Sequence, residues 1–182
     1  MNSGKYLGHR TIIVGEVHSG KTSATLKILR DLRGARAGSM AVLDLAPEKT
    51  GRVGGKMSLT DREREGLLYL SPLILPPRLL GRNEKEVDRM AEENRQRIDA
   101  VLENLRSAKA QILFVNDLSL YFHSGKTERL WREIEPFPTV IMNGYYGRYF
   151  RDSDLSRRER AEMESLMARC DRVLFLPPIP AS

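Results

Sequence analysis

One stretch of the sequence decides its fold, and it reads Gly15-Glu16-Val17-His18-Ser19-Gly20-Lys21-Thr22. It fits in full the pattern G-x-x-x-x-G-K-[ST], which is typical of a loop that wraps around phosphate groups. An apolar run at residues 11–14 precedes the stretch, and a helical pattern at residues 24–32 follows it. A strand, a glycine-rich loop and a helix in this order form the context in which such a loop binds phosphate.

Each part of this loop has a physical role in binding a nucleoside triphosphate. Gly15 and Gly20 let the backbone wrap closely, with its N–H groups pointing inward. The helix that begins near Lys21 offers the positive end of its dipole to phosphate. Lys21 is expected to reach the β- and γ-phosphates, and Thr22 to bind Mg²⁺ through its hydroxyl. The alternative is a glycine-rich turn with a surface lysine.

The sequence therefore predicts ATP, or another nucleoside triphosphate, and Mg²⁺ as cofactors. His18 is expected to face solvent rather than to act in catalysis. The residues predicted to contact the nucleotide are Gly15, Glu16, Val17, His18, Ser19, Gly20, Lys21, Thr22 and Ser23.

Apolar runs without polar alternation predict strands that are buried on both faces of a sheet. They cover residues 11–14, 40–45, 67–70, 111–115, 139–142 and 172–176. Helical patterns lie between them, at residues 24–32, 87–105, 127–134 and 155–170. This alternation predicts a three-layer α/β/α sandwich with a mainly parallel sheet of about five strands. We expect residues 1–182 to form a single nucleotide-binding domain of the P-loop NTPase fold.

The composition excludes several classes of protein. Of the 182 residues, 41% are hydrophobic and 30% are charged, so the chain is neither disordered nor a membrane protein. The single cysteine, Cys170, excludes an internal disulfide framework and a zinc site built from several thiolates. Residues 1–10 contain no apolar segment, so we expect a soluble cytoplasmic protein without a membrane partner. The net charge of +6 suggests an anionic partner.

A P-loop needs an acidic partner at the end of another strand, and the best candidate is the pair Asn116-Asp117. In the additional-strand division of P-loop proteins this Walker B pair is Asp-Glu; the Asp holds Mg²⁺ through water and the Glu polarises the attacking water. In the literal register, Asn116 removes a charge from the metal shell and Asp117 is a shortened base. If the register slips by one, Asp117 is the Mg²⁺ carboxylate and the base is missing. Hydrolysis is expected to be slow in either register, and an ordinary strand-end turn is the remaining alternative.

Other side chains at strand ends are also candidates. In the additional-strand architecture the strand at residues 139–142 lies between the Walker B strand and the P-loop strand. Asn143 would then face the γ-phosphate as a sensor, unless it only forms a turn before Gly144. Asp44 is either a metal or substrate carboxylate or a cap for the following loop. Arg148 either contacts phosphate, in cis or across a subunit interface, or is a solvated surface residue. The predicted catalytic residues are Lys21, Asp117 and Asn143, and the predicted metal ligands are Thr22, Asn116 and Asp117.

The order of these segments resembles that of the P-loop ATP:corrinoid adenosyltransferases. It is also similar to that of small archaeal and bacterial NTPases of the same additional-strand, RecA-like division. The resemblance implies the P-loop fold, ATP binding and, as an alternative activity, adenosyl transfer, in which a reduced cobalt centre attacks C5′ of ATP and triphosphate leaves. The loop is poorer in Gly and Lys than the family's, Asp-Glu is replaced by Asn116-Asp117, and Thr-Gly-Arg is replaced by Asn143-Gly144-Tyr145. The matching stretches are residues 15–22, 40–56, 87–107, 112–118 and 140–145.

Two basic loops allow more than one kind of binding partner. Residues 46–59 predict a basic loop, and residues 145–151 an aromatic and basic one. Base stacking beside arginine is a device for binding single strands, so a nucleotide-gated module for nucleic acid or a protein partner is a third hypothesis. Residues 157–160 are better explained as a solvated helix face, so nucleic acid is not the favoured partner. A second substrate and a homo-oligomer stay open, and the leading hypothesis is Mg²⁺-dependent, slow NTP hydrolysis.

Overall fold

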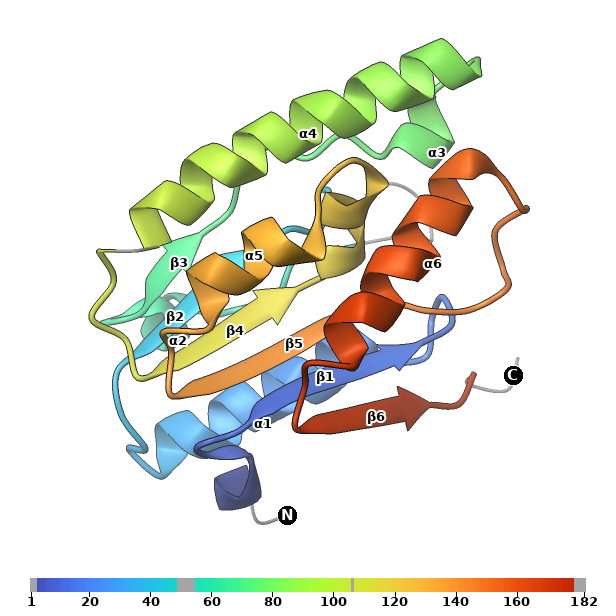
Figure 1. Ribbon diagram of the computed structural model, residues 1–182. Helices are drawn as coiled ribbons and strands as arrows, with labels where there is room; N and C mark the ends of the chain where they lie inside the picture. The colour runs from blue at the N-terminus through green and yellow to red at the C-terminus, as the bar shows by residue number, and fades with distance from the viewer. Residues whose placement is uncertain (1–2, 49–54, 106, 179–182) are drawn as a thin grey trace.

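The computed structural model describes residues 3–48, 55–105 and 107–178. Six parallel strands form one sheet in the order β3-β2-β4-β5-β1-β6 (Figure 1). The predicted parallel α/β fold is confirmed, with six strands rather than about five, because the short β3 pairs with β2 at one edge. The strands are β1 (Arg10–Gly15), β2 (Met40–Asp44), β3 (Leu68–Leu70), β4 (Ile112–Asn116), β5 (Thr139–Tyr145) and β6 (Arg172–Leu176).

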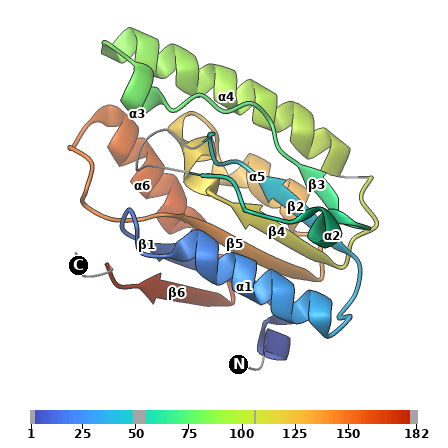
Figure 2. The ribbon, with the colours of Figure 1, turned by 180° about the vertical axis from the view of Figure 1, so that it is seen from behind.

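Helices cover both faces of this sheet (Figures 1 and 2). One face carries α1 (Lys21–Gly34), and the other carries α4 (Glu84–Leu105), α5 (Thr127–Ile134) and α6 (Asp154–Met167). The sequence patterns predicted these four helices but not the short ones, because a helix of one or two turns shows no periodicity. The short helices are η1 (Ser3–Tyr6), α2 (Asp61–Arg64), α3 (Pro77–Leu80) and η2 (Leu118–His123). In the described part of the chain, no helix is both long and apolar enough to cross a bilayer.

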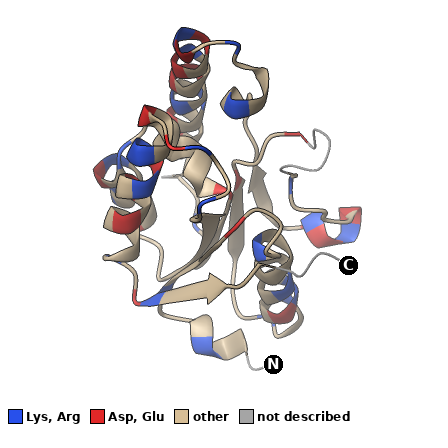
Figure 3. Cartoon of the chain, turned by 90° about the vertical axis from the view of Figure 1, so that its right-hand side faces the viewer, with Lys and Arg blue, Asp and Glu red and all other residues tan. Residues whose placement is uncertain are grey.

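The four central strands, β1, β2, β4 and β5, are buried on both faces, as their uninterrupted apolar sequences predict. The same prediction is wrong for β3 and β6, because these strands lie at the edges of the sheet and are partly exposed. In β1, Ile12 and Val14 pack into the core under α4, α5 and α6, whereas Ile13 packs into the core under α1. Each fully buried side chain of this kind contributes about 1.5–3 kcal/mol. Figure 3 shows that Lys, Arg, Asp and Glu lie mostly on the outer helices and that the sheet is nearly free of them.

The strand order brings the polar strand ends together. Strand β5 pairs with both β1 and β4, so it lies between the P-loop strand and the Walker B strand, as the additional-strand arrangement predicts. The register places Asp44 beside Asn116 and Ile13 beside Asn143. Because parallel strands all end at the same edge, this edge of the sheet holds the candidate site.

Candidate nucleotide-binding site

The loop between β1 and α1 has the conformation that its two glycines predict. Gly20 precedes α1 with a left-handed φ of 82°. At Gly15 a Cβ atom would lie 2.6 Å from the backbone oxygen of Leu176 and 2.7 Å from Ser19 Oγ, so no other residue fits there without a shift. His18 is also left-handed, with a φ of 62°, and it is exposed, in line with the expectation that it faces solvent.

The ammonium group of Lys21 is folded back into the loop. Its Nζ donates to the carbonyl oxygens of Glu16, at 2.5 Å, and Gly15, at 3.1 Å, and to Ser19 Oγ at 3.3 Å. Burial lowers the pKa of Lys21, and the nearby carboxylates of Asp117 and Glu16 oppose this shift. The cation is thus held inside the loop by neutral oxygen acceptors, which a phosphate group can replace with charged ones.

A chain of polar side chains joins this loop to the ends of β4 and β2. Thr22 Oγ1 donates to Asn116 Oδ1 at 3.1 Å, and Asn116 Nδ2 donates to Asp44 Oδ1 at 2.8 Å. Asn116 and Asp44 are both fully buried. The contact with Thr22 supports the literal register, in which Asn116 occupies the first Walker B position. In this register the carboxylate that would follow the loop is not at position 116. The nearest one in this chain of hydrogen bonds is Asp44, which is joined to Thr22 through Asn116.

Asp44 also holds the segment that follows β2. Its Oδ2 accepts hydrogen bonds from Met57 N at 2.7 Å and from the Tyr69 hydroxyl at 2.6 Å, and its Oδ1 accepts one from Ala46 N at 3.3 Å. Burial and this carboxylate together raise the pKa of Tyr69. Of the two roles considered for Asp44, these bonds support the cap.

The predicted basic loop at residues 46–59 is described only in part. Lys49 and Arg52 lie outside the described residues. Lys56 is described, and its Nζ lies 2.9 Å from the Glu48 carboxylate.

Asp117 follows β4 in a left-handed conformation, with a φ of 55°, which turns the chain into η2. Its carboxylate accepts a hydrogen bond from Ser119 Oγ at 3.0 Å. Burial raises the pKa of Asp117 to about 6; the charge of Glu159 adds to the shift, whereas Ser119 and Lys21 oppose it. A carboxyl group with a pKa of about 6 is charged at neutral pH and is a competent general base there.

Asn143 connects the candidate residues to one another. Its Nδ2 donates to Asn116 Oδ1 and to Thr25 Oγ1, both at 2.9 Å, and its Oδ1 accepts from Asp117 N at 3.1 Å. The alternative that Asn143 forms a turn is wrong, because β5 continues through Gly144 to Tyr145. Its place between the P-loop and β4 supports the predicted sensor role.

A cavity of about 390 Å³ lies at this edge of the sheet. One part of its wall consists of residues 17–23 together with Asp117 and Asn143. The other part is mainly apolar, with Pro47, Pro76, Pro77, Leu79, Leu120 and Phe150, and contains the polar side chains of Arg78, His123 and Glu159. The cavity thus brings together most of the predicted nucleotide-binding residues. Asn116 does not line it, but it is hydrogen-bonded to Thr22 and Asn143, which do.

The cluster of Arg78, His123 and Glu159 was not predicted from the sequence. Arg78 Nη2 donates to Glu159 Oε2 at 2.6 Å, and Arg78 Nη1 lies 2.8 Å from His123 Nε2. Because a guanidinium can only donate, Nε2 must accept, and His123 is neutral. Burial accordingly lowers the pKa of His123. Burial alone would raise the pKa of Glu159, but the guanidinium of Arg78 helps to hold it below its usual value.

The prediction of a solvated face at residues 157–160 is wrong for Glu159, which is 3% exposed. The cap of α6 is Ser153, whose side chain accepts a hydrogen bond from Ser156 N at 3.2 Å. Glu159 lies one turn after Leu155 and one turn before Met163, and both of these are buried. The spacing of four residues between them was a signal in the sequence that could have placed Glu159 on the buried face.

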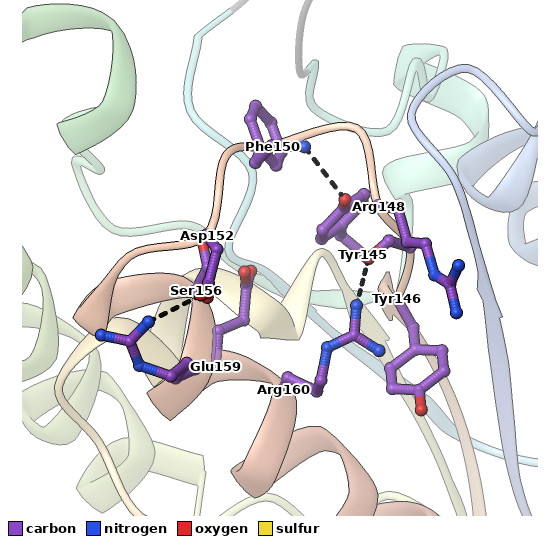
Figure 4. A pocket seen from close by; sticks show the side chains of 10 residues that line it. Tyr145, Tyr146, Arg148, Phe150, Asp152, Ser156, Glu159 and Arg160 are labelled. Carbon is purple, nitrogen blue, oxygen red and sulfur yellow. Dashed lines mark hydrogen bonds and ion pairs between the residues drawn. The ribbon is translucent and has the colours of Figure 1, made fainter.

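The aromatic loop and α6 enclose a second cavity of about 320 Å³ (Figure 4). The arginines of α6 that line it already have partners: Arg157 Nη1 lies 2.8 Å from the Asp152 carboxylate, and the guanidinium of Arg160 lies 4.9 Å from the centre of the Tyr146 ring. These pairings support the interpretation of an ordinary helix surface over that of a nucleic-acid site.

The aromatic loop is also fastened to the P-loop. The Glu16 carboxylate accepts hydrogen bonds from Arg148 N at 2.5 Å and from Tyr149 N at 3.3 Å. A Cβ atom at Gly147 would lie 2.2 Å from that carboxylate, so any other residue there would force the Glu16 side chain to move. Glu16, which was predicted to contact the nucleotide, therefore acts on the aromatic loop in this structure.

Comparison with known proteins supports the fold. No family model matches the sequence, and no curated protein matches it. The crystal structure of the flagellar accessory protein FlaH from Methanocaldococcus jannaschii is similar, with a TM-score of 0.52 and 10% sequence identity. The match covers 93% of this chain and 71% of that one. At this identity the likeness shows the fold alone, which is that of the P-loop NTPases.

Proposed function

We propose that this protein binds ATP, or another nucleoside triphosphate, together with Mg²⁺ and hydrolyses it slowly. The observation that carries this proposal is the hydrogen bond between Thr22, at the start of α1, and Asn116, at the end of β4, beside the partly buried amine of Lys21. The start of α1, the loop N–H groups and Lys21 supply positive potential for phosphates. The P-loop fold and the cavity at the same sheet edge support the same function.

The residues present fit a magnesium ion that is bound together with a nucleotide. Mg²⁺ prefers oxygen ligands and is usually held by few protein groups, water and substrate phosphates. Thr22 would hold it directly, with Asn116 and Asp117 acting through water. Within the described ranges, no group of three or more His, Cys, Asp or Glu side chains is placed to bind a metal. A bound ion would neutralise part of the phosphate charge.

The side chains of this site have distinct tasks in hydrolysis. Lys21 stabilises the charge that develops on the phosphate oxygens. Asp117 orients the attacking water and takes its proton, while the water oxygen bonds to the γ-phosphorus and the bond to the β–γ bridging oxygen breaks. Asn143 fixes the position of Asp117, because its side-chain oxygen accepts a hydrogen bond from the backbone N–H of Asp117. The reaction is slow because Asn116 carries no charge and Asp117 is one methylene shorter than glutamate.

Adenosyl transfer to a reduced corrinoid is the second candidate. This reaction needs groups that bind the triphosphate rather than an activated water. The neutral Asn116 should therefore slow it less than it slows hydrolysis. Product analysis after incubation with Mg²⁺ and ATP separates the two activities. ADP and phosphate support hydrolysis, whereas tripolyphosphate formed only with reduced cobalamin supports transfer. ATP that stays intact under both conditions would contradict both.

A further inference from the structure

Arg78 is a cation in the wall of the nucleotide cavity that the proposed mechanism does not use. It lies on the single turn of α3, which starts at Pro77, and it lines the same cavity as Lys21 and Thr22. The Arg78 side chain is 17% exposed, whereas that of Glu159 is 4% exposed and that of His123 is 1% exposed. The guanidinium is therefore the member of this cluster that a ligand in the cavity can reach.

The guanidinium of Arg78 is held in a fixed orientation. It lies 4.3 Å from the centre of the Phe150 ring, and Phe150 N is itself bonded to the Tyr145 hydroxyl at 3.3 Å. Its Nη2 bonds the Glu159 carboxylate and, at 3.3 Å, Ser156 Oγ. Glu159 projects from α6 towards the loop that carries these aromatic rings (Figure 4). An arginine fork that is held in this way is preorganised for a planar carboxylate or for phosphate oxygens.

The described side chains that line the cavity include charges of both signs. Among them, Lys21 and Arg78 are cations, and Asp117 and Glu159 are carboxylates. Burial raises the pKa of Asp117, and the charge of Glu159 adds to that shift. A phosphate group that enters is attracted by Arg78 and repelled by Glu159, and it has to compete with that carboxylate for the guanidinium.

We propose that Arg78 forms a second phosphate-binding subsite in this cavity and that Glu159 occupies it until a phosphate arrives. The proposal rests on the proposed function, because it assumes that a nucleotide binds at Lys21. The phosphate is either the terminal one of the triphosphate or that of a second, phosphate-bearing substrate. No covalent bond changes, because one anionic partner of Arg78 replaces another.

Substitutions of the two partners test this with opposite expected effects. Calorimetry gives the affinities for ATP and ADP, and their ratio measures recognition of the terminal phosphate. Arg78→Ala should lower the ratio about tenfold or more, which is the usual loss for a charge-assisted hydrogen bond. Glu159→Gln should raise it, because it removes the competing charge and keeps the shape. Arg82→Ala, in the same segment and exposed, is the matched control and should change nothing.

A second arm separates the sources of the phosphate. Inorganic phosphate is titrated into the ADP-loaded protein. If Arg78 binds the phosphate of a separate substrate, Arg78→Ala should lose this binding, whereas its ratio of ATP affinity to ADP affinity should equal that of the wild type. Weaker binding in both Arg78→Ala and Glu159→Gln, or no change in either arm, would overturn the proposal and leave nucleotide binding intact. Arg78→Lys keeps the positive charge but not the two parallel donors of the guanidinium, so it should lose less phosphate affinity than Arg78→Ala. It replaces Arg78→Ala in the test if that variant does not fold. If the wild-type protein binds neither ATP nor ADP, the proposed function fails as well.

Discussion

Asn116 donates a hydrogen bond from its Nδ2 to the Asp44 carboxylate at 2.8 Å, and both side chains are fully buried. The amide oxygen of the same residue accepts from Thr22 in the phosphate loop. Asparagine is able to make both bonds because its amide both donates and accepts, whereas an ionised carboxylate only accepts. The asparagine at this Walker B position is therefore matched to the aspartate on the neighbouring strand.

Replacement of Asn116 by aspartate should consequently destabilise the protein. Asn116→Asp removes the donor to Asp44 and places two buried carboxylates next to each other, at a cost of about 3 kcal/mol at neutral pH. The loss should shrink as the pH falls, because a proton shared by the pair restores the hydrogen bond. Thermal unfolding at pH 5 and pH 8 measures this. The exchanged pair Asp44→Asn with Asn116→Asp keeps one donor and should recover part of the loss. A single variant as stable as the wild type at pH 8 would contradict this account.

Hydrolysis should depend on the ionisation of Asp117. Burial raises its pKa to about 6, so the carboxylate is charged above that pH and protonated below it. As a general base it must be charged, and the turnover rate should therefore fall as the pH drops through about 6. Asp117→Asn should reduce turnover by about 10²–10⁴-fold and abolish this pH step. An unchanged pH profile in the variant would exclude Asp117 as the base.

The same substitution has an expected effect on stability. Because folding raises the pKa of Asp117, the folded state binds the proton more tightly than the unfolded state does. The free energy of unfolding should therefore decrease as the pH rises from about 4 to about 6 and the carboxyl group loses its proton. Asp117→Asn removes that cost and should unfold at a higher temperature than the wild type at pH 7. The difference should vanish near pH 4, and a variant that is less stable at pH 7 would speak against the buried charge.

Gly15, in the loop, and Gly34, at the far end of α1, give a matched pair of glycines for testing how closely the chain packs. Gly15→Ala forces a Cβ to within 2.6 Å of the Leu176 backbone oxygen and should destabilise the protein by about 1–3 kcal/mol. At Gly34, the last residue of α1, an added Cβ meets no atom within 4 Å. Gly34→Ala should therefore be neutral or stabilise by up to about 1 kcal/mol. Denaturant unfolding of both variants checks this, and equal effects would show that the close approach at Gly15 is not needed.

Much of this site was predictable because its signals are local. The loop at residues 15–22 follows a fixed spacing, and the buried run before Asn116 correctly placed that residue at the end of its strand. The run before Asn143 placed it near the end of β5, which continues for two more residues to Tyr145. The partnership of Asn116 with Asp44 was not predictable, because it depends on β2 and β4 being neighbours in the sheet. Arg78 was missed because one turn of helix after two prolines has no periodicity, although a proline at the first helical position is itself a start signal.

Glu159 was missed for a different reason. It stands among charged residues that are exposed, and the sequence of α6 around it has the composition of a surface helix. Its spacing of four residues from Leu155 and Met163 indicates the buried face, but the partner that stabilises its burial, Arg78, lies on another element and leaves no pattern along the chain.

The central claim, that a nucleotide binds at the loop around Lys21, is tested most directly by calorimetric titration with ATP in the presence of Mg²⁺. The wild-type protein should bind ATP, and Lys21→Ala should bind it at least about tenfold more weakly, because the cation in the loop is lost. Lys27→Ala is the matched control, since Lys27 lies on the same helix, is exposed and pairs with Asp31. Its affinity should equal that of the wild type. Equal ATP affinity in Lys21→Ala and the wild type, or no binding by either, would contradict the account.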